Sequence, residues 1–422
     1  MIKGGPKIIN DGLVLCLDAH DAKSYAGEPT TNVVTNTNLD TGWSKGYQSN
    51  IVYNDIEPPL GIDSQVVGHT RGSSAAYWYS YGDYAPQDPS VVYVVSMYVK
   101  TLDSNFRIAF YTANNSEAGR VWGSYITVPN DGKWHRVVWP SFTNPSNSQS
   151  DSLSFNFTYN GAIGDSSTKT WFCAPQMEAK SYATPFVDGS RSATNGWVDR
   201  SGNGNNGTLT NMIGTEASHY RDGEVIMPVA NSYLEFDGSD DYVTLGQSLD
   251  NVGSTASIEV WFKSEESIGS SQYAIMFGWG DGTSYYSNFS IGNWFGSWTD
   301  ESIHLGINSA AVILAERSGH SKYHDGNWHH AVATIGANNY AIYVDGSAVT
   351  TSFRYGSQST SFTNIFNFSS NTYSTIGSRP YTIATGGSGT FNGKIPLVRV
   401  YDKILTAAEV LSNYNATKGR FL

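Results

Sequence analysis

Charged residues are scarce in this sequence of 422 residues: they make up 15% of it, against about a quarter in an average globular protein. Acidic residues outnumber basic ones within this small set, and the formal net charge is −12. Proteins that bind nucleic acids present a basic face to the phosphates. The charge balance therefore argues against a nucleic-acid partner.

Long apolar runs are also missing. The sequence contains no stretch of eighteen apolar residues, which excludes a membrane-spanning helix of the usual kind. Residues 1–6 (MIKGGP) do not lead into the apolar core of a signal peptide, so we expect no secretory leader. We therefore predict a protein without a membrane partner, assembled in the cytoplasm.

Cysteine is nearly absent as well, with Cys16 and Cys173 as its only two positions. Each lies in a strand-like run far from the other, which favours buried free thiols over a disulfide. Reduced cysteines suit assembly in a bacterial cytoplasm.

Glycine and aromatic residues, by contrast, are abundant: there are 43 glycines, and 14% of the residues are aromatic. Aromatic and β-branched residues suit a pleated sheet, while Gly and Asn supply tight turns. Short apolar runs, such as residues 91–99, 153–159, 257–262 and 328–334, alternate with turns along most of the chain. This texture predicts an all-β fold made of β-sandwiches.

One short helix is predicted near the C-terminus. Thr406 and Glu409 have the spacing of a capping box, and Leu405 and Val410 that of a hydrophobic staple. We expect Val410, Leu411 and Tyr414 to face the sandwich and Gly419 to end the helix.

A five-residue motif occurs twice, as DGKWH at residues 131–135 and as DGNWH at residues 325–329. Each copy precedes an apolar run, so Asp-Gly predicts a turn and the Trp a plug at the edge of a sandwich. The repeat suggests two related sandwiches. A metal-binding or acid–base role for the Asp and His residues is the less favoured alternative. His329 and His330 would point to opposite faces of a strand and could not share a ligand.

The second half of the chain resembles a known family at this point. Residues 208–422 look like a laminin-G-like, concanavalin-A-like jelly roll, on the motifs at 236–243, 258–262, 325–330, 340–346 and 398–401. In such proteins, a segment like residues 12–19 runs almost directly into one like residues 199–209, but here about 170 residues separate them. The resemblance implies that a second domain is inserted at a surface loop. The expected boundaries are 1–25 for an N-terminal arm and first strand, 26–190 for the insert and 191–422 for the enclosing sandwich.

The insert itself resembles a jelly roll of the carbohydrate-binding-module type. Its ending, residues 175–178 with 181–185, and the chain's last residues, 409–421, are similar to segments of bacteriophage virion proteins. This resemblance implies a virion surface protein, as a capsid decoration or as a head-fibre or tail-associated component. Its partners would be other virion proteins of the capsid or tail, and homo-oligomers are compatible with this role. Residues 1–12 would serve as an anchoring arm.

The sequence gives little support to an enzyme. Glycoside hydrolysis needs two carboxylates that flank the sugar, and Glu259 is the only carboxylate within its predicted strand. Neither a Gly-x-Ser-x-Gly elbow nor a His-Glu-x-x-His motif occurs. We therefore predict a non-enzymatic protein that requires no cofactor.

A calcium site is an open alternative. In many relatives an acidic pair just before the strand that matches 398–401 contributes to such a site, but Pro396 and Leu397 stand there in this chain. Asp237, Asp240 and Asp241 could still supply part of the six to eight oxygens that calcium takes. Turn formation in a hairpin is the simpler role for these residues.

Exposed aromatic residues would provide stacking platforms for cell-surface or environmental glycans, although aromatic residues in sandwiches more often form the core. The candidates for glycan contact are Trp78, Tyr79, Tyr81 and Tyr84 in the insert, and Trp279, Tyr285, Tyr286, Trp294 and Trp298 in the enclosing sandwich. The alternative to a virion protein is a secreted lectin-like adhesin or the carbohydrate-binding part of a polysaccharide-degrading enzyme.

Overall fold

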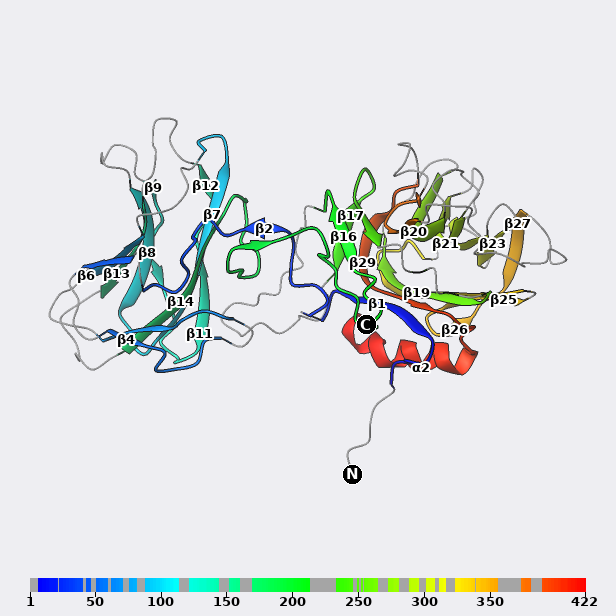
Figure 1. Cartoon of the computed structure of the whole chain (residues 1–422), viewed down its shortest axis with the longest axis horizontal. Coiled ribbons are helices and arrows are strands. Elements are labelled where there is room, and N and C mark those ends of the chain that lie inside the picture. Colours follow the sequence, from blue (N-terminus) through cyan, green and yellow to red (C-terminus); the bar gives the residue numbers. More distant parts are fainter. Residues whose placement is uncertain are drawn as a thin grey trace, which may run out of the picture. The chain divides into compact units, whose positions relative to one another are not determined.

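A computed structural model gives the architecture of the chain (Figure 1). The residues that it describes are 7–21, 23–40, 43–46, 51–59, 62–70, 76–81, 88–113, 121–143, 152–159, 169–212, 233–245, 249, 252, 254–264, 272–280, 288–295, 301–307, 311–315, 323–337, 339–355, 373–380 and 389–422. Strands dominate these residues, so the all-β fold class predicted from the sequence is confirmed.

The chain divides into two compact units. Unit 1 comprises the described residues within Met1–Glu28, Ala193–Ala217 and Pro228–Leu422, and unit 2 comprises those within Pro29–Ser192. The divisions thus fall at 28/29 and 192/193, beside the boundaries of 25/26 and 190/191 expected from the sequence. Two segments that are far apart in sequence therefore belong to unit 1.

Unit 1 contains a seven-stranded antiparallel sheet in the order β1-β29-β19-β24-β25-β26, with β17 also paired to β29. Its strands are β1 (Leu13–Asp18), β17 (Leu234–Asp237), β19 (Ala256–Lys263), β24 (Trp328–Gly336), β25 (Asn339–Val344), β26 (Ser347–Ala348) and β29 (Asn392–Tyr401). The N-terminal strand β1 pairs with β29, so that Cys16 lies opposite Arg399.

The second sheet of unit 1 has eight strands in the order β16-β18-β28-β20-β21-β22-β23-β27. They are β16 (Gly207–Thr210), β18 (Tyr242–Leu245), β20 (Gln272–Gly280), β21 (Asn288–Phe295), β22 (Glu301–Ile307), β23 (Ala311–Ala315), β27 (Thr351–Tyr355) and β28 (Tyr373–Ile376). Strand β19 shows how sequence alternation builds the core. Ile258, Val260 and Phe262 enter the main core with residues of this second sheet, while Glu259 and Trp261 project to the other face.

That other face is covered by the C-terminal helix α2 (Ala407–Thr417), which lies against β1 and β29 in Figure 1. The capping box is confirmed, because Thr406 and Glu409 each bind the other's backbone N–H. The prediction for Leu411 was wrong: its side chain is 46% exposed, and the buried helix positions are Val410, Asn413 and Thr417. Gly419 lies in a short 3-10 turn, Lys418–Arg420, that follows the helix. No helix in the described part of the chain is long and apolar enough to cross a membrane.

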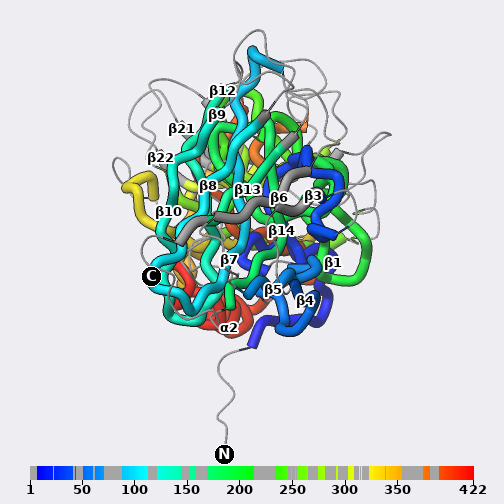
Figure 2. Tube along the Cα trace, turned by 90° about the vertical axis from the view of Figure 1, so that its left-hand side faces the viewer, coloured from blue at the N-terminus to red at the C-terminus, as the bar shows by residue number. Residues whose placement is uncertain are grey.

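Unit 2 is a sandwich of two six-stranded antiparallel sheets. The β8 sheet has the order β10-β8-β13-β6-β3, with β9 also on β8, and the β7 sheet has the order β11-β7-β14-β5-β4, with β12 also on β7. Figure 2 shows β8 and β13 side by side, with β10 and β9 flanking β8. A core rich in aromatic residues, including Phe106, Phe110 and Phe155, contains residues from both sheets.

The strands of the β8 sheet are β3 (Trp43–Gly46), β6 (Ala76–Tyr81), β8 (Phe106–Ala113), β9 (Val121–Trp122), β10 (Ile126–Thr127) and β13 (Ser152–Tyr159). Those of the β7 sheet are β4 (Ile51–Tyr53), β5 (Val67–Thr70), β7 (Val92–Thr101), β11 (Trp134–Val138), β12 (Phe142–Thr143) and β14 (Lys169–Glu178). At the base of unit 2, β2 (Thr30–Thr31) pairs with β15 (Ser190–Arg191), so its first and last residues lie together.

The loop of residues 199–206 joins the two separated segments of unit 1. Asp199 is buried, and its carboxylate accepts hydrogen bonds from the backbone N–H groups of Cys16 (2.9 Å), Ser201 (2.8 Å) and Asn205 (3.0 Å). The Asn205 side chain donates to the carbonyl of Val14 at 2.8 Å. This loop therefore secures strand β1, as expected for Asn and Asp side chains that satisfy backbone groups.

Candidate functional site

The two copies of the DGxWH motif make the same local structure. Asp131 accepts hydrogen bonds from the N–H of Lys133 (3.0 Å) and from His135 (2.8 Å), and Asp325 accepts from Asn327 (2.8 Å) and His329 (3.2 Å) in the same way. The glycine of each copy has a positive φ, which favours glycine at that point of the turn. The motif is therefore a turn closed by an Asp–His pair in both units.

His329 has a second partner in Asp345, whose carboxylate lies 2.9 Å from the other ring nitrogen. Burial lowers the pKa of His329, but hydrogen bonds to Asp345 and Asp325 outweigh it and raise the pKa above its usual value. Because both ring nitrogens are occupied, neither is available to a metal or a substrate. This arrangement favours a structural role for the motif.

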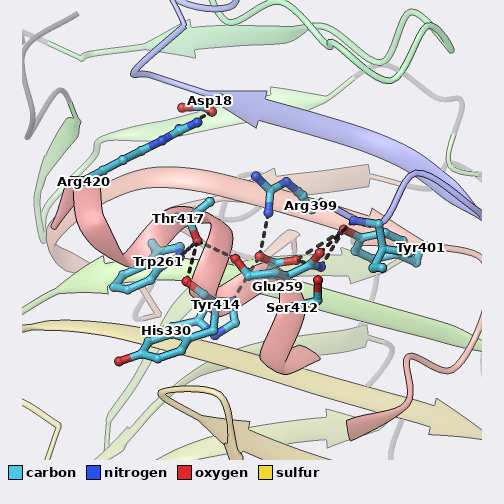
Figure 3. Close-up of polar contacts among 12 residues, drawn as sticks. Asp18, Glu259, Trp261, His330, Arg399, Tyr401, Ser412, Tyr414, Thr417 and Arg420 are labelled. Atoms are coloured by element: carbon cyan, nitrogen blue, oxygen red, sulfur yellow. Dashed lines mark hydrogen bonds and ion pairs between the residues drawn. The ribbon is translucent and has the colours of Figure 1, made fainter. Parts of the chain in front are cut away.

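Glu259 is the strand carboxylate considered above as a possible glycosidase residue, and it lies under α2 (Figure 3). Its side chain is fully buried, and its oxygens accept hydrogen bonds from Arg399 (2.7 Å) and Asn413 (2.7 Å). A ring nitrogen of His330 lies 3.0 Å away, and Tyr401 donates at 3.4 Å. No face of this carboxylate is open to a sugar, and through Asn413 the network ties α2 to the sheet.

The pKa of Glu259 follows from these contacts. Burial alone would raise it, but the charge of Arg399 and the hydrogen bonds from His330 and Asn413 hold it at about 2. The carboxylate is therefore ionised at neutral pH despite its burial.

Asp237, Asp240 and Asp241 lie together at the turn between β17 and β18, with carboxylate oxygens within 4.8 Å of one another. Asp241 is buried, and burial together with the charges of Asp237 and Asp240 raises its pKa to about 6. Asp237 also accepts from the N–H of Ser239 at 2.7 Å, and Asp241 from the N–H of Asp237 at 2.8 Å, which is the predicted turn role. With one oxygen from each, three carboxylates fit part of a calcium shell, and the remaining ligands would have to come from carbonyl groups or water.

Calcium binding at this turn stays a prediction. If this turn binds calcium, added calcium should raise the melting temperature of the wild type but not that of Asp241→Asn.

Of the aromatic residues predicted to contact glycans, Trp279 is corrected by the structure. Its side chain is 2% exposed and packs in the main core of unit 1, so no ring face is open for stacking. Trp78, Tyr79 and Tyr81 lie in β6 and Trp294 lies in β21, and only their backbone is described. Tyr84, Tyr285, Tyr286 and Trp298 lie outside the described residues.

Four residues that the sequence analysis did not single out lie together on the β8 sheet, two of them exposed and two half-buried. We call Arg107, Tyr111, Trp122 and Tyr125 the aromatic strip. Trp122 is 53% exposed, and no other tryptophan among the described side chains reaches the exposed class. Tyr125 is 44% exposed. The rings of Tyr111 and Trp122 stack with centroids 4.8 Å apart.

Strand register explains how these side chains share a face. Phe106, Ile108 and Phe110 of β8 enter the core, so Arg107 and Tyr111 project from the opposite face. Trp122 pairs with Tyr111 across β9, and Thr127 pairs with Arg107 across β10. Between these strands, Gly123 crosses above Phe110, where a Cβ would come within 2.3 Å of its ring. Only glycine fits at this position. The residues on either side of this crossing, Trp122 and Tyr125, are both exposed.

The strip was missed because its pattern is irregular. Trp122 and Tyr125 are three residues apart, a spacing that puts side chains on opposite faces of a regular strand. Residues 123–125 interrupt the strand and remove this restriction. The signal was the VWGSY sequence, an aromatic pair around a glycine.

The rest of this face carries small and polar residues. Ala109 and Ser154 are fully buried, and Asn156 is half-buried. Asn156 pairs with Ala109 on one side and with Trp78 on the other, so the predicted Trp78 stands in a cross-strand row that leads toward the strip. The accessible part of the face thus combines ring surfaces with an amide and a guanidinium, whose N–H groups can donate to the oxygens of a ligand.

Comparison with known families matches part of unit 1. A profile described as the concanavalin A-like lectin/glucanases superfamily matches residues 237–411, from the end of β17 into α2. This confirms the resemblance predicted for the C-terminal sandwich. Among proteins of curated function, none matches the chain in sequence.

Solved structures that match the chain include the following three. Domain 4 of an extracellular arabinanase from Geobacillus stearothermophilus, in complex with arabinotriose, is 17% identical over 53% of this chain and 94% of that chain, with a TM-score of 0.34. A sialidase carbohydrate-binding domain from Ruminococcus gnavus, bound to α2,3-sialyllactose, is 13% identical over 43% and 95%, with a TM-score of 0.32. The binding domain of botulinum neurotoxin DC is 16% identical over 52% of this chain and 48% of that chain, with a TM-score of 0.36.

Proposed function

We propose that the chain is a non-catalytic glycan-binding protein and that the aromatic strip of unit 2 is its binding surface. The observation that carries this proposal is the exposure of Trp122 and Tyr125 beside the stacked Tyr111. Burying ring surface is the main reason for aromatic residues to pack, so rings held open to solvent on an ordered sheet point to a ligand. The apolar face of a sugar ring is such a ligand.

The buried polar groups of unit 1 support the non-catalytic part. Glu259 is sealed beneath α2, and His329 is held between Asp325 and Asp345. Neither arrangement, among the described residues, offers the pair of accessible carboxylates that glycoside hydrolysis requires.

A glycan array probed with the whole chain tests this function. We expect Trp122→Ala to weaken binding to the best glycan about tenfold, or by about 1.4 kcal/mol. Tyr53→Ala is the matched control, because Tyr53 is 39% exposed but lies on β4 in the other sheet. Equal binding by wild type and Trp122→Ala would refute the strip as the binding surface.

We further propose that the protein is carried on the surface of a phage virion, as a capsid decoration or as a head-fibre or tail-associated component. This rests on the resemblance of residues 175–178, 181–185 and 409–421 to segments of virion proteins, and the two free cysteines are compatible with it. Immunogold labelling of purified particles tests it. Gold on heads supports decoration and gold on tails a tail component, whereas unlabelled particles with protein in the medium favour the secreted lectin-like adhesin.

A further inference from the structure

We infer that the aromatic strip selects glycans that carry a carboxylate, as uronic and sialic acids do, and that Arg107 is the residue that reads this charge. This inference rests on the proposed function and adds a ligand class to it. The guanidinium of Arg107 lies 5.4 Å from the ring centre of Tyr125, so the cation lies beside one of the two exposed rings of the strip.

Arg107 lacks the partners that a half-buried arginine normally has. Its Nε is shielded from solvent and has no hydrogen-bond partner, and no ion pair with Arg107 occurs among the described residues. Among the described residues, its guanidinium lies against the ring of Tyr125. A shielded N–H donor without an acceptor costs free energy. An anionic ligand at the guanidinium would supply acceptors for its N–H groups.

The geometry suits a carboxylate in particular. A guanidinium is planar and presents paired N–H donors, which match the two oxygens of a carboxylate. The contact with the Tyr125 ring restricts the motion of the guanidinium and so reduces the entropy lost on binding. A point cation such as lysine would provide charge without this directional match.

The aromatic strip has different chemical groups at its two ends. Arg107 and Tyr111 are four residues apart on β8, or about 13 Å along the strand. The stacked pair Tyr111–Trp122 therefore lies at one end and the cation at the other. A glycan with its ring on Trp122 would carry the carboxylate on another sugar or on an extended substituent, near Tyr125.

The charge of unit 2 is compatible with an acidic ligand. Residues 29–192 contain ten lysines and arginines and thirteen aspartates and glutamates, a formal net charge of −3, whereas the whole chain carries −12. Most of the acidic excess thus belongs to the enclosing sandwich. Repulsion of an anionic glycan by unit 2 is correspondingly small.

The test is an array that carries uronic-acid, sialic-acid, sulfated and neutral glycans, probed with the whole chain. We expect the strongest signals on carboxylate glycans, and at least a tenfold loss when the best of them is converted to its carboxyl-reduced form. Arg107→Gln should show the same loss on the acid form and no change on the reduced form. Arg107→Lys should fall between the two.

Two controls separate recognition from folding and from general charge. Lys133→Gln removes the same charge from an exposed site next to β11 and should change neither signal. The melting temperature of Arg107→Gln should equal that of the wild type, because the Arg107 side chain makes no hydrogen bond with the described residues.

Each other outcome overturns the inference. Signals led by neutral glycans and unchanged in Arg107→Gln would refute it and leave the proposed function standing, provided that Trp122→Ala abolishes them. Signals confined to sulfated glycans would refute the carboxylate assignment. No signal on any class would refute both the inference and the proposed function.

Discussion

Glu259 and Arg399 show at the scale of single residues how this chain uses its few charges. Both side chains are fully buried, and the ion pair between them is 2.7 Å long. A buried pair gains little over apolar packing, but removing one partner leaves an uncompensated charge. Asn413 and His330 fill the remaining positions around Glu259, which favours one seating of α2.

We expect Glu259→Gln to lower the free energy of unfolding by about 3–5 kcal/mol, because Arg399 then stays buried without its counter-charge. Chemical denaturation of unit 1 measures this loss. Glu235→Gln, at a partly exposed position paired with Lys394, should change it by less than about 1 kcal/mol. A loss at Glu259 no larger than at Glu235 would contradict the account.

The pH dependence follows from the same pair. The pKa of Glu259 is about 2 in the folded protein and near its ordinary value of 4.5 when unfolded. The stability that this depressed pKa contributes is complete above pH 4.5 and is lost as the pH falls toward 2. The difference in stability between wild type and Glu259→Gln should therefore shrink over that range. A constant difference from pH 7 to pH 3 would refute the assignment.

At the scale of elements, one part of helix α2 could be predicted from the sequence and another part could not. Its start was predictable, because the Thr406–Glu409 capping box is a local device. Its buried face was not, because Asn413 is drawn inward by Glu259 and Tyr401, over 150 residues and 12 residues away. Apolar patterning therefore pointed to Leu411, which is exposed. The same limit applies to the aromatic strip, where Gly123 breaks the period on which strand predictions depend.

The hydrogen bonds between residues 199–206 and β1 predict how strongly this strand is held in the sheet. Asp199→Ala removes acceptors from the backbone N–H groups of Cys16, Ser201 and Asn205, and we expect a loss of about 3 kcal/mol. Hydrogen exchange at the Cys16 amide should accelerate with it. Asn203→Ala, whose long hydrogen bonds of 3.3 Å to Leu13 and Val14 are exposed, should cost under about 1 kcal/mol. Unchanged exchange at Cys16 would show that β29 alone holds β1.

At the scale of the whole molecule, the chain leaves and re-enters unit 1 at adjacent points. Ser24 and Val198 exchange two hydrogen bonds of 2.6 Å, and Arg200 donates to the carbonyl of Cys16 at 2.8 Å. At the ends of unit 2, Thr30 and Arg191 are opposite each other in the antiparallel pair β2–β15. The composition and the motifs indicated two sandwiches, and the close approach of these ends is set by pairings across more than 150 residues.

Removing residues 29–192 and joining Glu28 to Ala193 with a short Gly-Ser linker should leave unit 1 folded, because both ends of the cut are already held together. Circular dichroism should show a cooperative melt, and glycan binding should be absent. Residues 29–192 alone should fold and retain binding. A shortened chain that fails to melt cooperatively would show that unit 1 depends on its insert.

The paired entry and exit of unit 2 also bear on how such a protein changes over generations. A segment attached at two neighbouring points can be replaced by recombination at just those points, without altering a strand of the enclosing sandwich. A lineage could then acquire a new glycan specificity in a single exchange. Diversity among its descendants would be concentrated between residues 29 and 192, while the outer sandwich would be inherited with little change.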